Sequence, residues 1–314
     1  MTARLILSRL LSSIPTLLIV AVIVFLMLRL SPVDPAAIMA GDLATPEMVA
    51  AIRADLGMDQ PMHVQFWNWM VQLGQGDFGQ SILSRQPVRE LIWQRAEPTI
   101  ALATTTLLLA VLVAIPLGVI AAWRHGGWLD RGVMLFSVLG FSVPVFVVSY
   151  VYIYVAAIQL QWLPVQGFAP LADGLGPFVR QLTLPTLALA FPYVALFARI
   201  TRASLLNVLG EDYIRTAHAK GVAERTVLIK HGLRNAAVPI VSVIGTGFAA
   251  LVGGVAVTES VFNIPGVGRL IVDAVLARDY PIIQGVIIVL AAMYVVVNLL
   301  IDIAYVLLDP RIRY

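Results

Sequence analysis

The ionisable side chains inside long apolar stretches are the residues of this sequence that could carry chemistry. Of its 314 residues 60% are hydrophobic and only 12% are charged, and a carboxylate within an apolar run is costly unless it has a partner or a function. Glu259 lies near the end of one such run, and Asp302 follows Asn298 by four residues in another. We interpret Glu259 as a gate or a structural polar group. For Asp302 we favour a structural pair with a nearby arginine over a proton relay.

The motifs of common hydrolytic, metal-binding and nucleotide-binding sites are absent from the sequence. It has no G-x-x-x-x-G-K-[ST] phosphate loop and no H-E-x-x-H pair, and the segment GFSVP at 140–144 fails the G-x-S-x-G pattern. It has no cysteine, and its four histidines show no ligand spacing. We therefore predict a non-catalytic chain with no metal site and no cofactor of its own. The scarcity of buried charge also disfavours an ion-coupled secondary transporter.

Six apolar segments are long enough to cross a bilayer as helices of about 20 residues. They predict an all-α, polytopic membrane protein with six transmembrane helices. The first segment exceeds the about 7–15 residues of a signal-peptide core, so we expect it to be retained as a span. The six segments are 10–30, 99–123, 133–159, 182–206, 236–261 and 282–308.

The distribution of Lys and Arg predicts the orientation of these spans. With a cytoplasmic N-terminus, thirteen basic residues fall in cytoplasmic segments and seven in outer segments, as the positive-inside rule requires. Both termini and the segment 210–239 are then cytoplasmic. The segment 31–98 lies outside.

The segment 31–98 reads as a small helical subdomain. Thr45-Pro46 begins one amphipathic helix, Pro61 begins a second, and a third lies near 88–95. The segment has eight acids against four arginines. It is either a docking surface for an external partner or a cap on the spans. We therefore divide the chain into 1–98, the first span with its outer subdomain, and 99–314, a core of five spans.

The fifth predicted span has an unusual face of small and hydroxyl-bearing residues. A second small row, Gly245, Ala249 and Gly253, lies beside the first. In lipid such a face indicates close helix packing or the wall of a polar path, and we expect both. The first row, with residues four apart, is Ser242, Thr246, Ala250, Gly254 and Thr258.

The segment 210–239 is a charged interruption between two predicted spans, with five basic and three acidic residues in thirty. Acids at 211 and 212 suit the start of a helix, and Gly221 suits its end. A second helix is expected from about 224 to 234. A helix–glycine–helix elbow can present a rigid knob to the groove of a partner. An ordinary basic loop is the alternative on spacing alone.

This segment resembles the EAA loop (about 207–236) of permease subunits of ABC importers, with Ala217, Ala219, Gly221 and Pro239 at the expected places. The resemblance is to the dipeptide/oligopeptide/nickel/glutathione permease family and covers nearly the whole chain. The stretches that carry it are RLLSSIPTLLIV, Asp34-Pro35, LGMDQP, GDFGQS, IPLGV, QWLPVQG, TES–VFNIPGVGRL, RDYPIIQG and the closing DPRIRY.

The resemblance implies a type I importer permease of MetI-like fold in the bacterial inner membrane. Its implied partners are a second, homologous permease subunit forming a heterodimer, two ABC ATPase subunits that bind ATP and Mg, and an extracytoplasmic solute-binding protein. No nucleic acid is implied. The resemblance also implies a coupling helix that docks in the ATPase. Its expected contact residues are Glu211, Asp212, Arg215, Ala217, Ala219, Gly221 and Arg225.

The transported substrate is expected to be a peptide of the dipeptide or oligopeptide class. The lack of clustered His, Cys and Met ligands in the spans favours peptides or glutathione over nickel, although importers of all three share the architecture. His218 departs from the arginine that family members often have at this position. This departure leaves the family assignment intact and concerns the contact with the ATPase.

Overall fold

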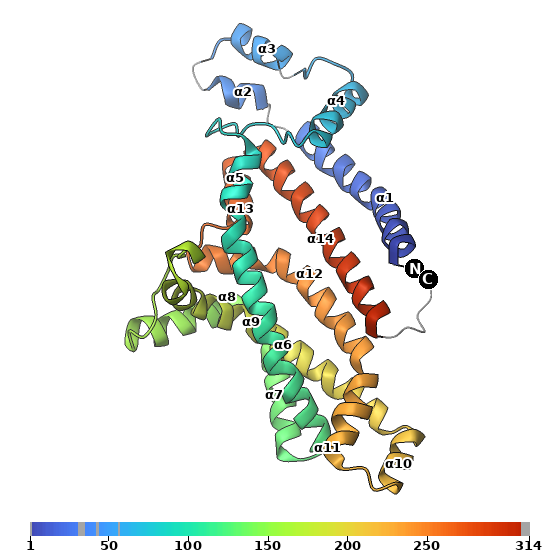
Figure 1. Ribbon diagram of the computed structural model, residues 1–314. Helices are drawn as coiled ribbons and strands as arrows, with labels where there is room; N and C mark the ends of the chain where they lie inside the picture. Colours follow the sequence, from blue (N-terminus) through green and yellow to red (C-terminus); the bar gives the residue numbers. More distant parts are fainter. Residues whose placement is uncertain (1, 31–34, 42–43, 56, 309–314) are drawn as a thin grey trace. The chain divides into compact units, whose positions relative to one another are not determined.

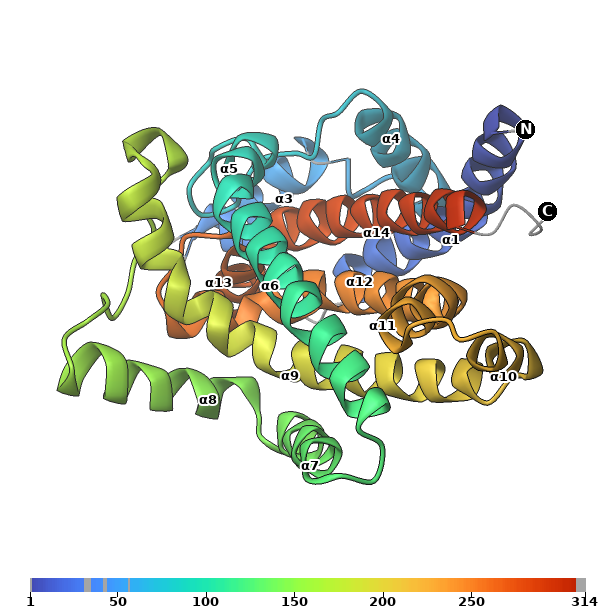
Figure 2. The same ribbon diagram turned by 60° about the horizontal axis from the view of Figure 1, so that its bottom comes forward.

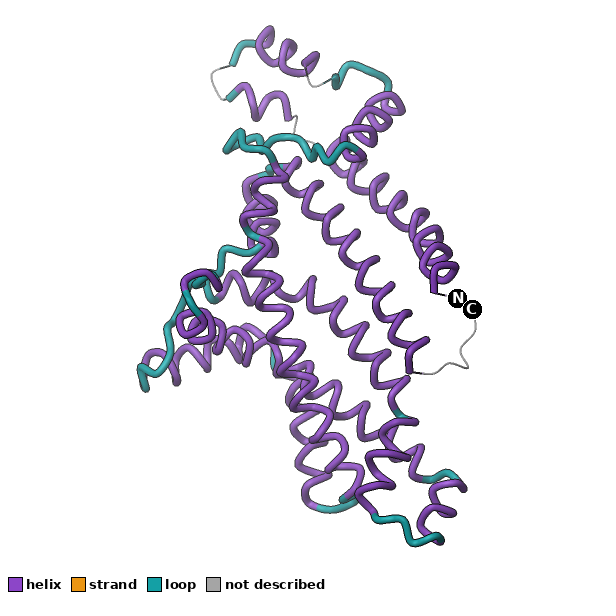
Figure 3. The backbone as a smooth tube through the Cα atoms, viewed as in Figure 1, coloured by secondary structure: helices purple, strands orange, loops and turns teal. Residues whose placement is uncertain are grey.

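The computed structural model describes residues 2–30, 35–41, 44–55 and 57–308, and these residues are mainly helical (Figures 1 and 3). No strand occurs among them, although one antiparallel bridge joins Gln80 and Pro87. The predicted all-α class is confirmed. Three motifs lie outside the described residues in whole or in part: Asp34 of Asp34-Pro35, Leu56 of LGMDQP, and DPRIRY at 309–314.

The chain divides into two compact units by its internal contacts. Unit 1 is formed mainly by Ala3–Glu97 and Arg269–Val295, and unit 2 mainly by Pro98–Gly268 and Val296–Tyr314. This grouping differs from the sequence-based division at residue 98, because it places residues 269–295 with the N-terminal part.

Unit 1 contains the three helices expected in the segment 31–98. Phe25 and Phe66 pack edge to face with ring centroids 5.3 Å apart, and Arg29 Nε donates to Gln65 Oε1 at 2.6 Å. These contacts join the first helix to the fourth. The helices of this unit are α1 (Thr2–Arg29), α2 (Pro35–Ala40), α3 (Pro46–Asp55), α4 (Met62–Gly74) and α5 (Val88–Gln94), followed by most of α13 and the first part of α14.

The start of α3 shows the predicted cap. The Thr45 hydroxyl accepts a hydrogen bond from Met48 N at 3.4 Å. The backbone N–H of Glu47, followed by the Thr45 hydroxyl, lowers the pKa of the Glu47 carboxyl. Because the charged form of Glu47 is favoured there, the acid also suits the positive end of the helix.

Unit 2 is organised around α9, which packs against the seventh, eighth and twelfth helices. Figure 2 shows α9 as the long helix that leads into α10, with α8 beside it. Its buried face is rich in alanine and other small residues, so neighbouring helices approach closely. The elements of this unit are α6 (Ala96–Trp123), α7 (Trp128–Ser142), α8 (Val145–Tyr152), η1 (Ile153–Gln159), α9 (Leu175–Leu209), α10 (Asp212–Ala219), α11 (Glu224–Thr226), η3 (Val227–Leu233) and α12 (Ala237–Val261), with the end of α14.

The predicted spans correspond to helices with one correction. Four described helices are long and apolar enough to cross a membrane, and two bent pairs raise this number to six if each is one span. The third predicted span, 133–159, is not continuous, because Trp128–Ser142 and Val145–Gln159 meet at 103°. Pro144 stands at the N-cap of α8, where it cannot donate the backbone hydrogen bond that a continuous helix needs.

The last two helices of the described chain are α13 (Val267–Ala277) and α14 (Tyr280–Leu308). The sequence-based prediction places no helix between the fifth and sixth spans, so α13 was not predicted. Its buried face is short, with Val267, Leu270 and Ala274 each at most 5% exposed.

Candidate functional site

The segment between α9 and α12 folds as a compact elbow, which we define as residues 211–226. Gly210 closes α9, and Glu211 in extended conformation begins α10. On α10 the Ile214 side chain is only 1% exposed, while its helix neighbours are exposed or half-buried. One apolar anchor therefore holds a short helix whose other faces remain open to a partner.

Gly221 ends α10 in the conformation that the sequence predicted. Its φ is +72°, in the left-handed region that favours glycine. Gly221 N donates to His218 O at 2.9 Å, and Val222 N donates to Ala217 O at 3.2 Å. These two bonds form the Schellman pattern that satisfies the last carbonyls of a helix. The direction of the chain after α10 is thus fixed by backbone bonds.

A side-chain bond spans the same turn. His218 Nε2 and Glu224 Oε2 are 3.0 Å apart, which links the end of α10 to the start of α11. Both side chains are about half exposed, so the bond adds little stability by itself. It bridges the turn between the two helices.

The elbow is held to α9 through the π-helical turn η3. Leu205 of α9 and Leu228 of η3 are buried together with Ala122 of α6. A Cβ at Gly232 would lie 2.7 Å from Leu205 Cδ1, so only glycine allows this approach without displacement. Tightly packed side chains of η3 and α9 therefore support the elbow.

The expected contact residues are mostly exposed. Asp212 and Arg215 form an i,i+3 ion pair at 2.9 Å, with side chains 91% and 76% exposed. Ala217 is half-buried, and its carbonyl accepts the hydrogen bond from Val222 N in the turn at Gly221. The exposed members of the expected set are Glu211, Asp212, Arg215, Ala219, Gly221 and Arg225.

The expected path residues on α12 have different environments. Thr246 and Ala250 are exposed, whereas Ser242 and Gly254 are half-buried. Thr258 is fully buried, and its hydroxyl has no hydrogen-bond partner among the described residues. The row is therefore open over its middle part and closed at Thr258.

Two glycines on α12 lie beside aromatic side chains of α9, and Gly247 makes room for one ring. A Cβ at Gly247 would lie 2.7 Å from the Phe197 ring, and one at Gly254 would lie 3.7 Å from the Tyr193 hydroxyl. Gly253 faces open space. Helix packing and an open small-residue surface thus lie side by side on one helix.

Glu259 is fully buried at the end of α12. Thr99 Oγ1 donates to Glu259 Oε1 at 2.6 Å and accepts from Val267 N at 2.8 Å. A Cβ at Gly266 would overlap the Glu259 carboxylate. This geometry describes a structural polar group. Asn298 and Asp302 are half-buried on α14.

A buried ion pair between α7 and α9 was missed by the sequence reasoning. Both guanidinium nitrogens Nε and Nη2 of Arg202 donate to the Asp130 carboxylate, the Nη2 bond being 2.8 Å. Gly126 N donates to the same carboxylate at 2.9 Å, and His125 Nδ1 lies 3.1 Å from it. An acid three residues after the N-cap Gly127 was the available signal.

A second missed contact lies within unit 1. Asp279 is 2% exposed, and its carboxylate accepts from Ser81 Oγ at 2.5 Å, Ile82 N at 3.2 Å and Leu83 N at 3.4 Å. Ser81 closes the motif GDFGQS, and Asp279 belongs to RDYPIIQG. Two motifs about 200 residues apart in sequence therefore meet in one hydrogen-bonded cluster.

Family models and curated relatives match almost the whole chain. A family described as binding-protein-dependent transport system inner membrane component matches residues 114–314, and a family described as its N-terminal component matches residues 2–103. A probable peptide ABC transporter permease protein of Sinorhizobium fredii is 52% identical over 309 residues, covering 98% of this chain and 99% of the relative.

Two other relatives cover the chain equally well. A glutathione transport system permease protein of Salmonella typhimurium is 45% identical and covers 98% of both chains. A putative peptide transport system permease protein of Brucella melitensis is 43% identical and covers 100% of both. Among solved structures, an inward-facing MetNI methionine ABC transporter chain matches with a TM-score of 0.59 at 16% identity, over 70% of this chain and 96% of that chain. This last match shows the fold alone.

Proposed function

Because this chain belongs to the family of binding-protein-dependent transport system inner membrane components, we propose that it forms half of the translocation pathway of an ATP-driven peptide importer. The chain is a multi-pass inner-membrane protein. In the proposed assembly it pairs with a homologous permease, two ABC ATPases and an extracytoplasmic solute-binding protein. The ATPases bind ATP and Mg and hydrolyse the nucleotide, and this chain holds no cofactor.

The observation that carries the proposal is the exposed, capped elbow. Its charged residues project from a helix whose end is fixed by Gly221 and whose base is packed on α9. A rigid knob can transmit the closure of a partner, because a partner shifts a conformational equilibrium only through contacts that differ between the two states. A mobile loop would absorb the same movement.

The orientation of the chain belongs to the proposal. The elbow must face the ATPases, so both termini lie in the cytoplasm in this arrangement, in accord with the distribution of basic residues. The exposed middle part of α12, at Thr246 and Ala250, then contributes to the wall of the path.

The substrate class is proposed from the relatives. Two of them are named peptide permeases, and one is named a glutathione permease. Glutathione is itself a small peptide, so it is the second candidate substrate. The binding of dipeptides, oligopeptides and glutathione by the cognate solute-binding protein, measured by calorimetry, separates the two.

Replacement of Gly221 by Trp tests the coupling role in the complete transporter reconstituted in proteoliposomes. The new side chain enters open space, since nothing lies within 4 Å of a Cβ at this position. The expected result is normal assembly with the ATPases and a fall in peptide uptake per ATP hydrolysed.

Gly76 provides the matched control. It has a φ of +76° and equally open surroundings, but it lies in the turn after α4. Gly76→Trp should therefore impose similar backbone strain without uncoupling. Normal coupling in Gly221→Trp, or equal uncoupling in both variants, would contradict the proposed role of the elbow.

A further inference from the structure

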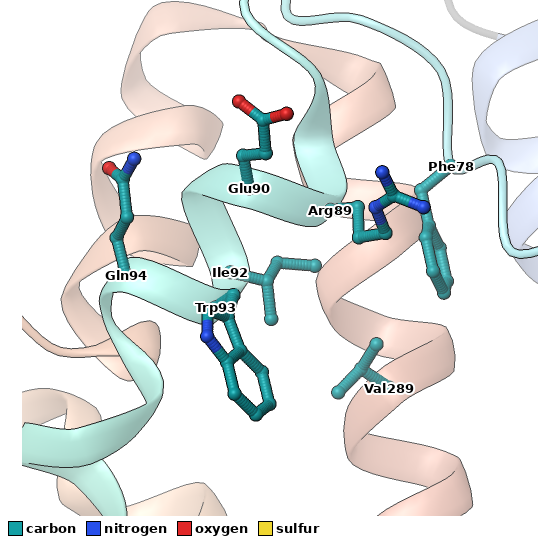
Figure 4. Close-up of a pocket in the computed structure, with 7 residues that line it drawn as sticks. All are labelled: Phe78, Arg89, Glu90, Ile92, Trp93, Gln94 and Val289. Atoms are coloured by element: carbon teal, nitrogen blue, oxygen red, sulfur yellow. The ribbon is translucent and has the colours of Figure 1, made fainter.

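A groove of about 550 Å³ lies on the surface of unit 1, beside α5 and α14. Figure 4 shows the side chains that line it: Phe78, Arg89, Glu90, Ile92, Trp93, Gln94 and Val289. Its volume falls within the range of about 300–1,000 Å³ that is usual for small-molecule sites. The proposed transport function assigns no role to it.

The groove lies beside a close contact between two helices. A Cβ at Gly285 of α14 would lie 2.7 Å from Val88 Cγ1 of α5, so the helices touch at this level. Ile92 and Val289 lie one helical turn further along α5 and α14, and both line the groove. The groove is thus built on a close contact between packed helices.

The lining is amphipathic. Ile92, Trp93 and Val289 form an apolar part, and Figure 4 shows Glu90 and Arg89 above it, with the Glu90 carboxylate directed away from the apolar side chains. Arg89 and Glu90 are both exposed, and neither forms an ion pair with any residue in the described part of the chain. A cation and an anion therefore stand unpaired at the polar end of an apolar groove.

Several residues that line the groove lie just before a candidate membrane span in the sequence. Gln94 is the last residue of α5, and α6, a candidate membrane span, starts at Ala96. Val289 lies on another candidate span. Trp93 is 81% exposed, and tryptophan is enriched where hydrocarbon meets headgroups.

We propose that this groove binds a single phosphatidylethanolamine molecule. An acyl chain packs against Trp93 and Val289, the lipid phosphate accepts hydrogen bonds from the Arg89 guanidinium, and the primary ammonium donates to the Glu90 carboxylate. The charge pattern selects this occupant, because a phosphate and an ammonium on one headgroup match one cation and one anion.

The same charge pattern predicts a lower affinity for related phospholipids. Phosphatidylcholine has a quaternary ammonium with no N–H, so it cannot donate to Glu90. Phosphatidylglycerol has no ammonium, so its glycerol hydroxyls can donate only neutral hydrogen bonds to Glu90 and leave the charge of this carboxylate uncompensated. The wild-type chain should therefore bind phosphatidylethanolamine about tenfold more tightly than either, the effect of one charge-assisted hydrogen bond.

Native mass spectrometry of the full-length chain in detergent, titrated with these three lipids, tests the proposal. Arg89→Gln should weaken phosphatidylethanolamine and phosphatidylcholine alike by about tenfold, because both have the phosphate. Glu90→Gln should leave phosphatidylcholine unchanged and bring the ratio between the two lipids to about one. Val289→Trp should fill the groove and abolish the bound lipid.

Matched controls are available in the same chain. Arg85 is an exposed arginine that does not line the groove, and Val296 is an exposed residue further along α14, so Arg85→Gln and Val296→Trp should bind lipid as the wild type does. Should Val289→Trp fail to fold, Arg89→Gln and Glu90→Gln still test the proposal.

Three results would overturn the proposal. They are equal binding of the three lipids by the wild type, equal effects of Arg89→Gln and Arg85→Gln, or displacement of the lipid by a millimolar dipeptide. None of them affects the proposed coupling role of the elbow.

Discussion

Two aspartate–arginine pairs in unit 2 have the same chemistry and opposite surroundings. Asp130 and Arg202 join α7 to α9, with side chains 5% and 17% exposed. Asp212 and Arg215 lie on α10 with side chains 91% and 76% exposed. The first pair also receives bonds from the turn between α6 and α7. The second is local to one helix.

The difference separates charges that hold the fold from charges that remain available to a partner. The first pair depends on Arg202, because its removal leaves the buried Asp130 carboxylate without its counter-charge. An exposed pair contributes little to stability, since water solvates either member alone. The α6–α7 turn is therefore a fixed joint, and the elbow keeps its charges free for contact.

The largest effect is expected for Arg202→Ala. The change leaves the Asp130 carboxylate buried without its main donor, and it should lower the free energy of unfolding by about 3 kcal/mol. Thermal unfolding of the purified chain in detergent measures this loss. Arg131→Ala, at an exposed position one residue from Asp130, is the control and should change stability little.

The next effect is expected at the base of the elbow. Gly232→Val should clash with Leu205, which a Cβ at Gly232 would already approach to 2.7 Å. The free energy of unfolding should fall by about 1–3 kcal/mol. The same unfolding assay measures this loss. If Gly232→Val were as stable as the wild type, the elbow would not rest on a tightly packed base.

A smaller effect is expected at the turn of the elbow. Gly221→Ala should cost about 1 kcal/mol, because alanine is disfavoured at a φ of +72°. Gly221→Asn should cost less, since asparagine tolerates the left-handed region. Denaturant unfolding compares the two. Equal stability of both variants and the wild type would show that this turn is not held in the described conformation.

The smallest effect on stability is expected for Arg215→Ala. Loss of the exposed pair with Asp212 should change the free energy of unfolding by less than about 0.5 kcal/mol. Uptake per ATP in the reconstituted transporter should nevertheless fall if the residue contacts the ATPase. A stability loss equal to that of Arg202→Ala would remove the distinction between the two pairs.

Local signals in the sequence predicted much of the fold and the turn of the candidate site. The cap at Thr45, the starts of α4 and α5 and the end of α10 at Gly221 all depend on residues within a few positions of one another. Such features follow from backbone preferences and capping, which short segments express on their own.

The missed features depend on contacts between distant segments. Pro15, Pro116 and Pro185 lie inside continuous helices, whereas the chain bends at Pro144, and no local pattern separated these cases. The bonds of Asp130 with Arg202 and of Asp279 with Ser81 span 72 and 198 residues. A single sequence without its fold contains no measure of such proximity.

The hydroxyl of Thr99 has a consequence for the placement of a single hydrogen atom. A hydroxyl has one proton and two lone pairs, and here Oγ1 already accepts from Val267 N. Its proton remains available for Glu259 Oε1, which accepts it at 2.6 Å. One atom thus sets the polarity of a hydrogen-bond chain that runs from the start of α13 through α6 to the end of α12.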